Sequence, residues 1–276
     1  MSIAIVTDST CDLPTALIET YSIHVVPNLV IIGGESYEDG VGITREAFYN
    51  QLPGMSHPPT TATSSAGVYQ KLYEDLLSRG AQSIISIHAA SQLSGIFNAA
   101  MVGAQPFEPL INVLDSGQLS LGLGFQVLAA AQVVKNGATL DTVLEKIKEV
   151  SRKVYVMAML DTLEYIRRSG RVSWARARLG NLLQVKPFLS IQDGKVFSLG
   201  EVRTRSKGIN QIKEMILNLG PLHRLAILHT NAEEEANQIL AGVQAPSDGQ
   251  PLVVHVTTVI GAHVGPRGLG FAAIVE

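Results

Sequence analysis

Short apolar runs alternate with helical patterns through most of the first half of this chain. Each run is rich in β-branched residues, is followed by a polar turn, and leads into apolar residues at helical spacing. Three such units are predicted: residues 3–7 before a helix that begins near Pro14, 83–87 before 97–103, and 111–114 before 118–135. Repeated strand-to-helix alternation predicts a mainly parallel, Rossmann-like sheet with helices on both faces.

The segment between the first two units breaks this alternation. Its predicted elements are a hairpin over 25–37, a helix over 44–51 and, after a loop, a helix over 68–77. Gly33 and Gly34 favour the turn of the hairpin. We therefore predict an excursion from the sheet over about residues 25–52, and we expect the polar cluster 60–65 at a helix N-terminus.

A second series of elements begins near residue 154. It comprises predicted strands at 154–160, 188–191, 196–199, 225–229 and 252–259, helices at 161–168, 206–219 and 232–241, and a glycine-rich loop over 261–270. A length of 276 residues exceeds the usual size of one domain. We predict an α/β protein of two domains, an N-terminal domain over 1–151 and a C-terminal α/β domain over 152–276, with a ligand between them.

Composition narrows the class of protein. Hydrophobic residues make up 46% of the chain, charged residues 16%, and the net charge is −3, which gives no overall attraction to nucleic acid. The single cysteine, Cys11, excludes an internal disulfide and fits a reducing compartment, so we expect a cytoplasmic protein. The N-terminus has no export signal, and the apolar segment 119–134 is too short for a bilayer span, so we expect no membrane insertion.

Three polar clusters suggest a site for one carboxylate or phosphate. Residues 60–65 and 91–95 are rich in Ser and Thr, and His263 lies among small residues in 261–266. Ligands of parallel sheets gather beyond the carboxyl ends of the strands, and hydroxyls at helix N-termini suit an anion. Ordinary helix capping and a structural histidine are the alternative interpretation. The other six histidines lack metal-binding spacing, and we propose no metal.

Five arginines fall within the twelve residues 167–178 without an acidic residue. This basic segment fits a bound anion or a docked partner, or simply a solvated face. The one nearby aromatic residue, Trp174, is too little for stacking nucleic acid bases. Motifs for nucleotide loops and serine hydrolases are missing from the sequence. Asp8 and Asp12 form a candidate carboxylate pair, although capping and bracing of a loop is the favoured interpretation.

Several of these segments together resemble the DegV family, which includes the fatty-acid-binding subunits of bacterial fatty acid kinases. The resemblance spans the chain and rests on TDSTCDLP at 7–14, SQLSG at 91–95, DS at 115–116, LEYIRRSGR at 163–171, KP at 186–187 and GAHVGP at 261–266. It implies two α/β domains that enclose a long-chain fatty acid. It also implies that a separate kinase subunit supplies ATP and phosphorylates the carboxylate, so that this chain is a carrier with no cofactor and no catalytic residue of its own.

The resemblance also implies roles for particular residues. Thr61 and Ser94 would hydrogen-bond the carboxylate, with His263 and Arg171 close to it. We expect the acyl chain to contact Val156, Ala158, Leu160, Phe188 and Leu189, and a partner to dock on Arg167, Arg168, Arg203 and Arg267. The chain departs from the usual family pattern at Ala62, Thr63, Ser64, Ile96 and Arg267.

Two other functions remain open from the sequence. One is an enzyme for a small phosphorylated or carbonyl substrate, with His263 as acid/base or nucleophile and Asp8 assisting. The other is a regulatory module that binds a protein through the arginine segment. A deep apolar cavity would favour the carrier, a small polar cleft would favour the enzyme, and the regulatory module would need no enclosed ligand.

Overall fold

The computed structural model describes residues 2–172, 175 and 185–276, and their strands form three sheets. The first is a four-stranded parallel sheet in the order β2-β1-β6-β7. Its strands are β1 (Ile3–Asp8), β2 (Ile23–Val26), β6 (Ser83–His88) and β7 (Ile111–Asp115). The chain leaves β1 toward one edge of this sheet and leaves β6 toward the other, so the carboxyl ends of β1 and β6 flank a topological switch point, where parallel sheets bind ligands.

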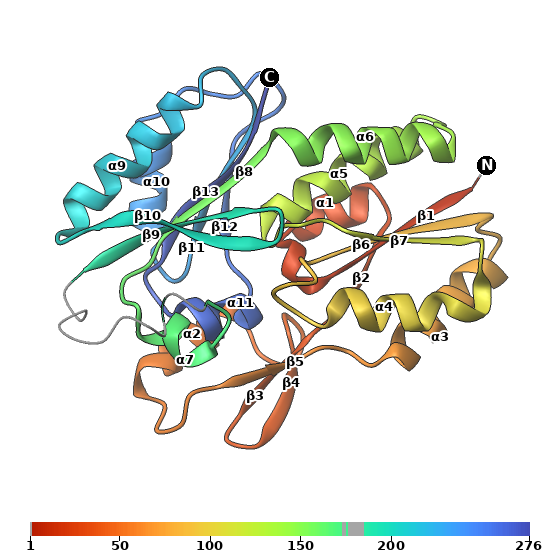
Figure 1. Ribbon diagram of the computed structural model, residues 1–276, viewed down its shortest axis with the longest axis horizontal. Coiled ribbons are helices and arrows are strands. Elements are labelled where there is room, and N and C mark those ends of the chain that lie inside the picture. The colour runs from red at the N-terminus through yellow and green to blue at the C-terminus, as the bar shows by residue number, and fades with distance from the viewer. Residues whose placement is uncertain (1, 173–174, 176–184) are drawn as a thin grey trace.

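Helices cover both faces of the parallel sheet, as the alternation predicts (Figure 1). They are α1 (Thr15–Thr20), α3 (Ala66–Ser78), α4 (Ile96–Ala104), α5 (Leu121–Lys135) and α6 (Leu140–Lys153). Helix α5 is buried over most of its length, and this burial explains why its sequence is so apolar. A helix at the surface would need more polar positions. Helix α6 is amphipathic and was not among the predicted elements.

The second sheet is mixed and has the order β10-β9-β8-β13-β11-β12. Its strands are β8 (Val154–Met159), β9 (Lys186–Gln192), β10 (Lys195–Val202), β11 (Leu222–His229), β12 (Leu252–His255) and β13 (Leu269–Val275). Helices α9 (Arg205–Asn218) and α10 (Glu233–Leu240) cover one face. Part of the other face shares a continuous core with the parallel sheet and α5. The α/β class is confirmed, whereas the boundary at residue 151, which falls near the end of α6, stays a prediction.

The excursion forms a third, antiparallel sheet in the order β4-β3-β5, together with α2 (Arg45–Gln51). Its strands are β3 (Leu29–Ile32), β4 (Glu35–Glu38) and β5 (Thr60–Ala62). Gly33 and Gly34 have positive φ, as the predicted hairpin turn requires. The prediction was wrong at the start of the hairpin, because β2 ends before Pro27 and belongs to the parallel sheet. Proline has no N–H to donate, so it separates two strands that the apolar pattern joins.

The structure corrects two further expectations near the predicted site. Residues 252–259 do not form one strand, because β12 ends at His255 and α11 (Thr258–Val264) follows. His263 therefore lies in the last turn of a helix and not in a glycine-rich loop. The cluster 60–65 contributes β5 as well as the residue before α3, so Thr61 lies on a strand and not at a helix N-terminus.

Candidate functional site

A cavity of about 170 Å³ lies between the carboxyl ends of the parallel strands, one face of the mixed sheet, and α11. Most of its described lining residues are aliphatic, among them Ile96, Leu119, Ile166, Ile191, Leu228 and Ile260. Val156, Ala158, Leu160 and Leu189, the residues expected to contact an acyl chain, are also among them. The cavity is thus apolar along much of its wall, with polar groups from several separate segments.

Phe188 was expected beside these residues, but it is not among the described residues that line the cavity. Successive side chains of a strand point to opposite faces of the sheet. Leu189 faces the cavity, and Phe188 points the other way into the core beneath α9, where it is 1% exposed. The alternation of β9 therefore assigns Phe188 to packing.

The four residues expected near a carboxylate all line this cavity. Thr61 comes from β5, Ser94 from the loop after β6, Arg171 from the segment after α7 (Glu164–Ser169), and His263 from α11. Thr61 Oγ1 lies 2.9 Å from His263 Nε2, and Arg171 Nη1 donates a hydrogen bond of 2.9 Å to the carbonyl oxygen of Leu93, the neighbour of Ser94. Segments up to 202 residues apart in sequence thus meet at the cavity, and the charge of Arg171 acts on His263.

His263 is uncharged at neutral pH in this setting. Burial lowers the pKa of its imidazole to about 4, and the positive charge of Arg171 acts in the same direction. A neutral imidazole carries one N–H donor and one acceptor nitrogen. The tautomer of His263 therefore decides whether Nε2 or the Thr61 hydroxyl donates the hydrogen bond between them.

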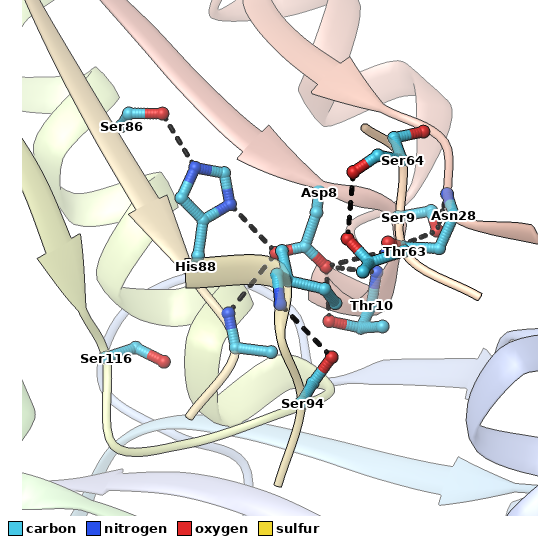
Figure 2. A network of polar contacts seen from close by, with 12 residues as sticks. Asp8, Ser9, Thr10, Asn28, Thr63, Ser64, Ser86, His88, Ser94 and Ser116 are labelled. Carbon is cyan, nitrogen blue, oxygen red and sulfur yellow. Dashed lines mark hydrogen bonds and ion pairs between the residues drawn. The ribbon is translucent and has the colours of Figure 1, made fainter. Parts of the chain in front are cut away.

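Asp8 holds together the two loops that flank the switch point (Figure 2). Its carboxylate accepts hydrogen bonds from Thr10 N (3.0 Å), Thr10 Oγ1 (2.5 Å), Asn28 Nδ2 (3.2 Å), Ala89 N (3.2 Å) and His88 Nδ1 (3.0 Å). Burial alone would raise the pKa of Asp8, but the hydrogen bond and charge of His88, together with Thr10, lower it. Asp8 therefore braces the loops, as the favoured interpretation of the sequence has it.

Hydrogen bonds connect Asp8, His88 and Ser86 in the same order as the residues of a catalytic triad. His88 Nε2 lies 2.7 Å from Ser86 Oγ, which in turn lies 2.8 Å from the hydroxyl of Tyr73. Asp8, Ser86 and His88 are fully buried and are not among the described residues that line the cavity. Because Ser86 does not line the cavity within the described residues, we interpret these hydrogen bonds as structural. The sequence offered no signal for His88, because its partner Asp8 is 80 residues away.

Asp12 occupies a second buried position, at the start of α11. It accepts hydrogen bonds from Ser120 Oγ (2.6 Å) and Thr257 N (2.8 Å), and Arg45 Nη2 lies 3.3 Å away. Burial raises the pKa of Asp12 to about 6, although Arg45 opposes the shift. Since Ser120 lines the cavity, Asp12 connects the cavity wall to the beginning of the helix that carries His263.

Two further histidines stack against each other where β11 and β12 end. The rings of His229 and His255 are 4.7 Å apart, and each ring accepts a backbone hydrogen bond, from Ala232 N to His229 Nδ1 (3.3 Å) and from Asn231 N to His255 Nε2 (3.2 Å). Burial lowers the pKa of both to about 4, and for His255 the neighbouring His229 adds to the shift. Protonation would remove both acceptors.

We expect the stability of the fold to decrease as the pH falls from 6.5 to 4. In this window the unfolded chain binds protons at His229, His255 and His263 that the folded chain does not bind, so unfolding takes up protons. Asp12 acts in the opposite direction below pH 6, but it is one group against three. Urea unfolding at several pH values measures the effect. In the variant His255→Gln the free energy of unfolding should decrease less steeply with falling pH. The variant His57→Gln, which changes an exposed histidine, should match the parent. An unfolding midpoint that rises on acidification would contradict the expectation.

The arginines expected to dock a partner are exposed. Arg168 forms an ion pair with Glu164 one helical turn away, and Arg267 Nε lies 3.9 Å from Asp161. Arg167 and Arg203 are also at the surface. Trp174, Arg176 and Arg178 of the basic segment lie outside the described residues.

The residues that depart from the family pattern lie in separate segments of the chain. Ile96 lines the cavity, where it is 2% exposed and adds apolar surface. Thr63 Oγ1 donates to the carbonyl oxygen of Ser64, and Ser64 Oγ donates to that of Pro27, so these hydroxyls hold the loop before α3. Ala62 pairs with Leu29 across β3 and β5.

The described part of the chain contains no helix long and apolar enough to cross a membrane. Within the same residues, no group of three or more His, Cys, Asp or Glu side chains is placed to hold a metal ion.

Together these features define an α/β protein with an apolar cavity between two sheets and a hydroxyl-, imidazole- and guanidinium-lined end. A family model described as "Uncharacterised protein, DegV family" matches residues 2–276. Protein DegV of Bacillus subtilis is 33% identical over 276 residues, which cover 98% of each chain. The chain belongs to the DegV family.

Solved structures of relatives share the whole fold. A DegV family protein from Thermus thermophilus, whose structure is described as showing fatty acid binding, is 31% identical, with a TM-score of 0.92 and coverage of 100% of both chains. The structure of DegV from Bacillus subtilis, described as a fatty acid binding protein, is also 31% identical, with a TM-score of 0.87 over 100% of both chains.

Proposed function

We propose that this chain is a cytoplasmic carrier that encloses a long-chain fatty acid, with the acyl chain in the cavity and the carboxylate at Thr61, Ser94, His263 and Arg171. The observation that carries the proposal is a single cavity with largely aliphatic walls, at which these four polar side chains from four segments converge. The fatty acid binding described for the relatives from Thermus thermophilus and Bacillus subtilis supports it.

The energetics of such a complex favour a long chain. Burial contributes about 0.8 kcal/mol per methylene, so a dozen methylenes contribute roughly 10 kcal/mol. This offsets the cost of taking one carboxylate out of water, provided that its oxygens accept hydrogen bonds. The tail therefore supplies most of the affinity, and the polar end of the cavity sets the orientation.

A bound carboxylate would also determine which groups donate the hydrogen bonds at the polar end of the cavity. A carboxylate only accepts, so the Thr61 hydroxyl must donate to it. The Thr61 oxygen is then free to accept from His263 Nε2, 2.9 Å away, which requires the tautomer of His263 with its proton on Nε2. In this arrangement His263 orients Thr61 and remains neutral, consistent with its low pKa of about 4.

The carrier would present the carboxylate to a separate ATP-dependent kinase subunit. Neutral hydroxyls hold a carboxylate while leaving an oxygen able to attack a γ-phosphate, whereas bidentate guanidinium contacts would engage both oxygens. Arg171 already donates to the carbonyl oxygen of Leu93, which ties up part of its guanidinium. The kinase subunit would contribute ATP, and this chain the bound substrate.

Equilibrium binding tests the proposed function. After removal of bound lipid, a fluorescent long-chain fatty acid should bind with a stoichiometry of one, and unlabelled palmitate should displace it. Small phosphorylated or carbonyl compounds should not displace it, because they offer no apolar surface to the cavity walls. Displacement by such a small polar compound, without displacement by palmitate, would favour the enzyme over the carrier.

Docking on the exposed arginines gives a separate prediction. The double variant Arg167→Ala/Arg168→Ala should lower acyl phosphate formation by the kinase subunit about tenfold or more while leaving fatty acid affinity unchanged, since rim charges act mainly on association. Trapping the acyl phosphate with hydroxylamine measures turnover. Lys71→Ala, on the distant helix α3, is the control for loss of positive charge, and turnover equal to the parent in the double variant would remove these arginines from the docking surface.

A further inference from the structure

The excursion supports both members of the Thr61–His263 pair. Thr61 lies on β5, which pairs with β3 so that Thr61 is opposite Val30. Helix α11, which carries His263, packs against α2, β3 and β5 (Figure 1). The distance between these two side chains is therefore set largely by how α11 rests on the three-stranded sheet.

Asp39 joins this sheet to the first turn of α11. It follows directly after β4, its backbone N–H donates to the carbonyl oxygen of Asn28 (2.9 Å), and its side chain is buried. The carboxylate accepts from the hydroxyl of Thr257, from Thr258 N (3.1 Å) and from Thr258 Oγ1 (2.7 Å). One side chain thus satisfies the N-terminal donor of Thr258 and two hydroxyls at the start of the helix.

Tyr49 of α2 fixes the same helix from the side. Its hydroxyl lies 3.1 Å from the carbonyl oxygen of Val256 and 3.2 Å from that of Thr257, as their donor. A Cβ at Gly261 would overlap the Tyr49 ring, so glycine permits this close approach. Tyr49 thus holds the middle of α11 and Asp39 holds its start. Together they determine the position of His263, which lies two residues after Gly261.

We propose that Asp39 is a positioning residue for the polar end of the cavity: by tying the first turn of α11 to the three-stranded sheet, it sets the contact between His263 and Thr61 and so the preference for a carboxylate over an uncharged head group. This inference rests on the proposed fatty acid binding. Asp39 is not among the described residues that line the cavity, so it acts through Thr61 and His263.

Comparing two ligands with the same tail separates positioning from general stability. In Asp39→Ala, affinity for palmitate should fall about 10-fold, the loss expected for one hydrogen bond to a charged group, while affinity for hexadecanol stays within about 2-fold. Both are measured by displacement of a fluorescent fatty acid. In a Thr61→Val background, Asp39→Ala should cause no further loss for palmitate, because the two residues act in one pathway. Asp75→Ala, which removes an exposed partner of Arg79, is the matched control and should change neither affinity.

Equal weakening of both ligands, or additive losses in the Thr61→Val background, would overturn the inference by assigning Asp39 a purely structural role. If Asp39→Ala does not fold, Thr258→Val removes one hydroxyl donor to Asp39 and should give a smaller change in the same direction. A ligand-free measurement separates this inference from the proposed function. The ring ¹⁵N chemical shifts of His263 should change in Asp39→Ala, because they report the hydrogen bond between Nε2 and Thr61 Oγ1, which are 2.9 Å apart in the parent. Unchanged ring shifts in a variant whose parent binds palmitate overturn the inference alone, whereas failure of the parent protein to bind palmitate overturns the proposed function.

Discussion

Replacing Ser94 by Ala should weaken fatty acid binding roughly 10- to 100-fold, because a hydrogen bond to a charged group contributes about 1.5–3 kcal/mol. Ser94 lies in the loop after β6, and its hydroxyl accepts only a long hydrogen bond of 3.4 Å from Ile96 N, so the loop keeps most of its contacts in the variant. Isothermal titration with palmitate measures the loss. Thermal unfolding should shift little, since the Ser94 backbone N–H still bonds to Ala90.

Ser65→Ala is the matched control for this substitution. Ser65 belongs to the other hydroxyl-rich cluster and precedes α3, but it is exposed and makes no side-chain capping hydrogen bond. It should bind palmitate like the parent. Unchanged binding by Ser94→Ala would remove Ser94 from the carboxylate site.

The second large effect is expected from filling the cavity. In Ala158→Phe, a ring on β8 would occupy space that the acyl chain needs, since Ala158 lines the cavity between Val156 and Leu160. Displacing four methylenes would cost about 3 kcal/mol, which is more than a hundredfold in affinity for palmitate. Shorter fatty acids should lose less, so the preferred chain length should decrease. A series of chain lengths in the displacement assay measures this.

Ala16→Phe makes the same substitution at an exposed position of α1 and should leave the whole series unchanged. If Ala158→Phe weakened all chain lengths equally, the ring would be acting through the fold and not through the cavity. Unchanged affinity for palmitate would show that the acyl chain does not pass Ala158.

The sequence predicts what depends on local periodicity. β-branched runs at residues 3–7, 83–87 and 111–114 become parallel strands, because near-continuous apolar runs suit a sheet that is buried on both faces. The alternation of β8 likewise brings Val156 and Ala158 to one wall, together with Leu160 directly after the strand. The four polar residues expected from the family resemblance lie together at the cavity, although their roles in binding stay predictions.

The features that the sequence did not predict depend on contacts between distant segments. Helix α11 has only seven residues, three of them β-branched apolar residues, and its first turn is held by Asp12 and Asp39, which are 245 and 219 residues away from their partners Thr257 and Thr258. No local pattern carries such a capping interaction, so the sequence predicts a strand through residue 259 and a loop from residue 261 where the structure has a helix. Phe188 shows the same limit at smaller scale, because an apolar strand with both faces buried does not reveal which face lines a cavity.

The identity of the ligand carried by the purified protein tests the central claim most directly. Denaturing mass spectrometry of protein purified without detergent, and then incubated with a mixture of fatty acids, should release close to one long-chain fatty acid per chain. The Ala158→Phe variant prepared in parallel should release far less palmitate. Parent protein that neither copurifies with a fatty acid nor takes one up from the mixture would contradict the account.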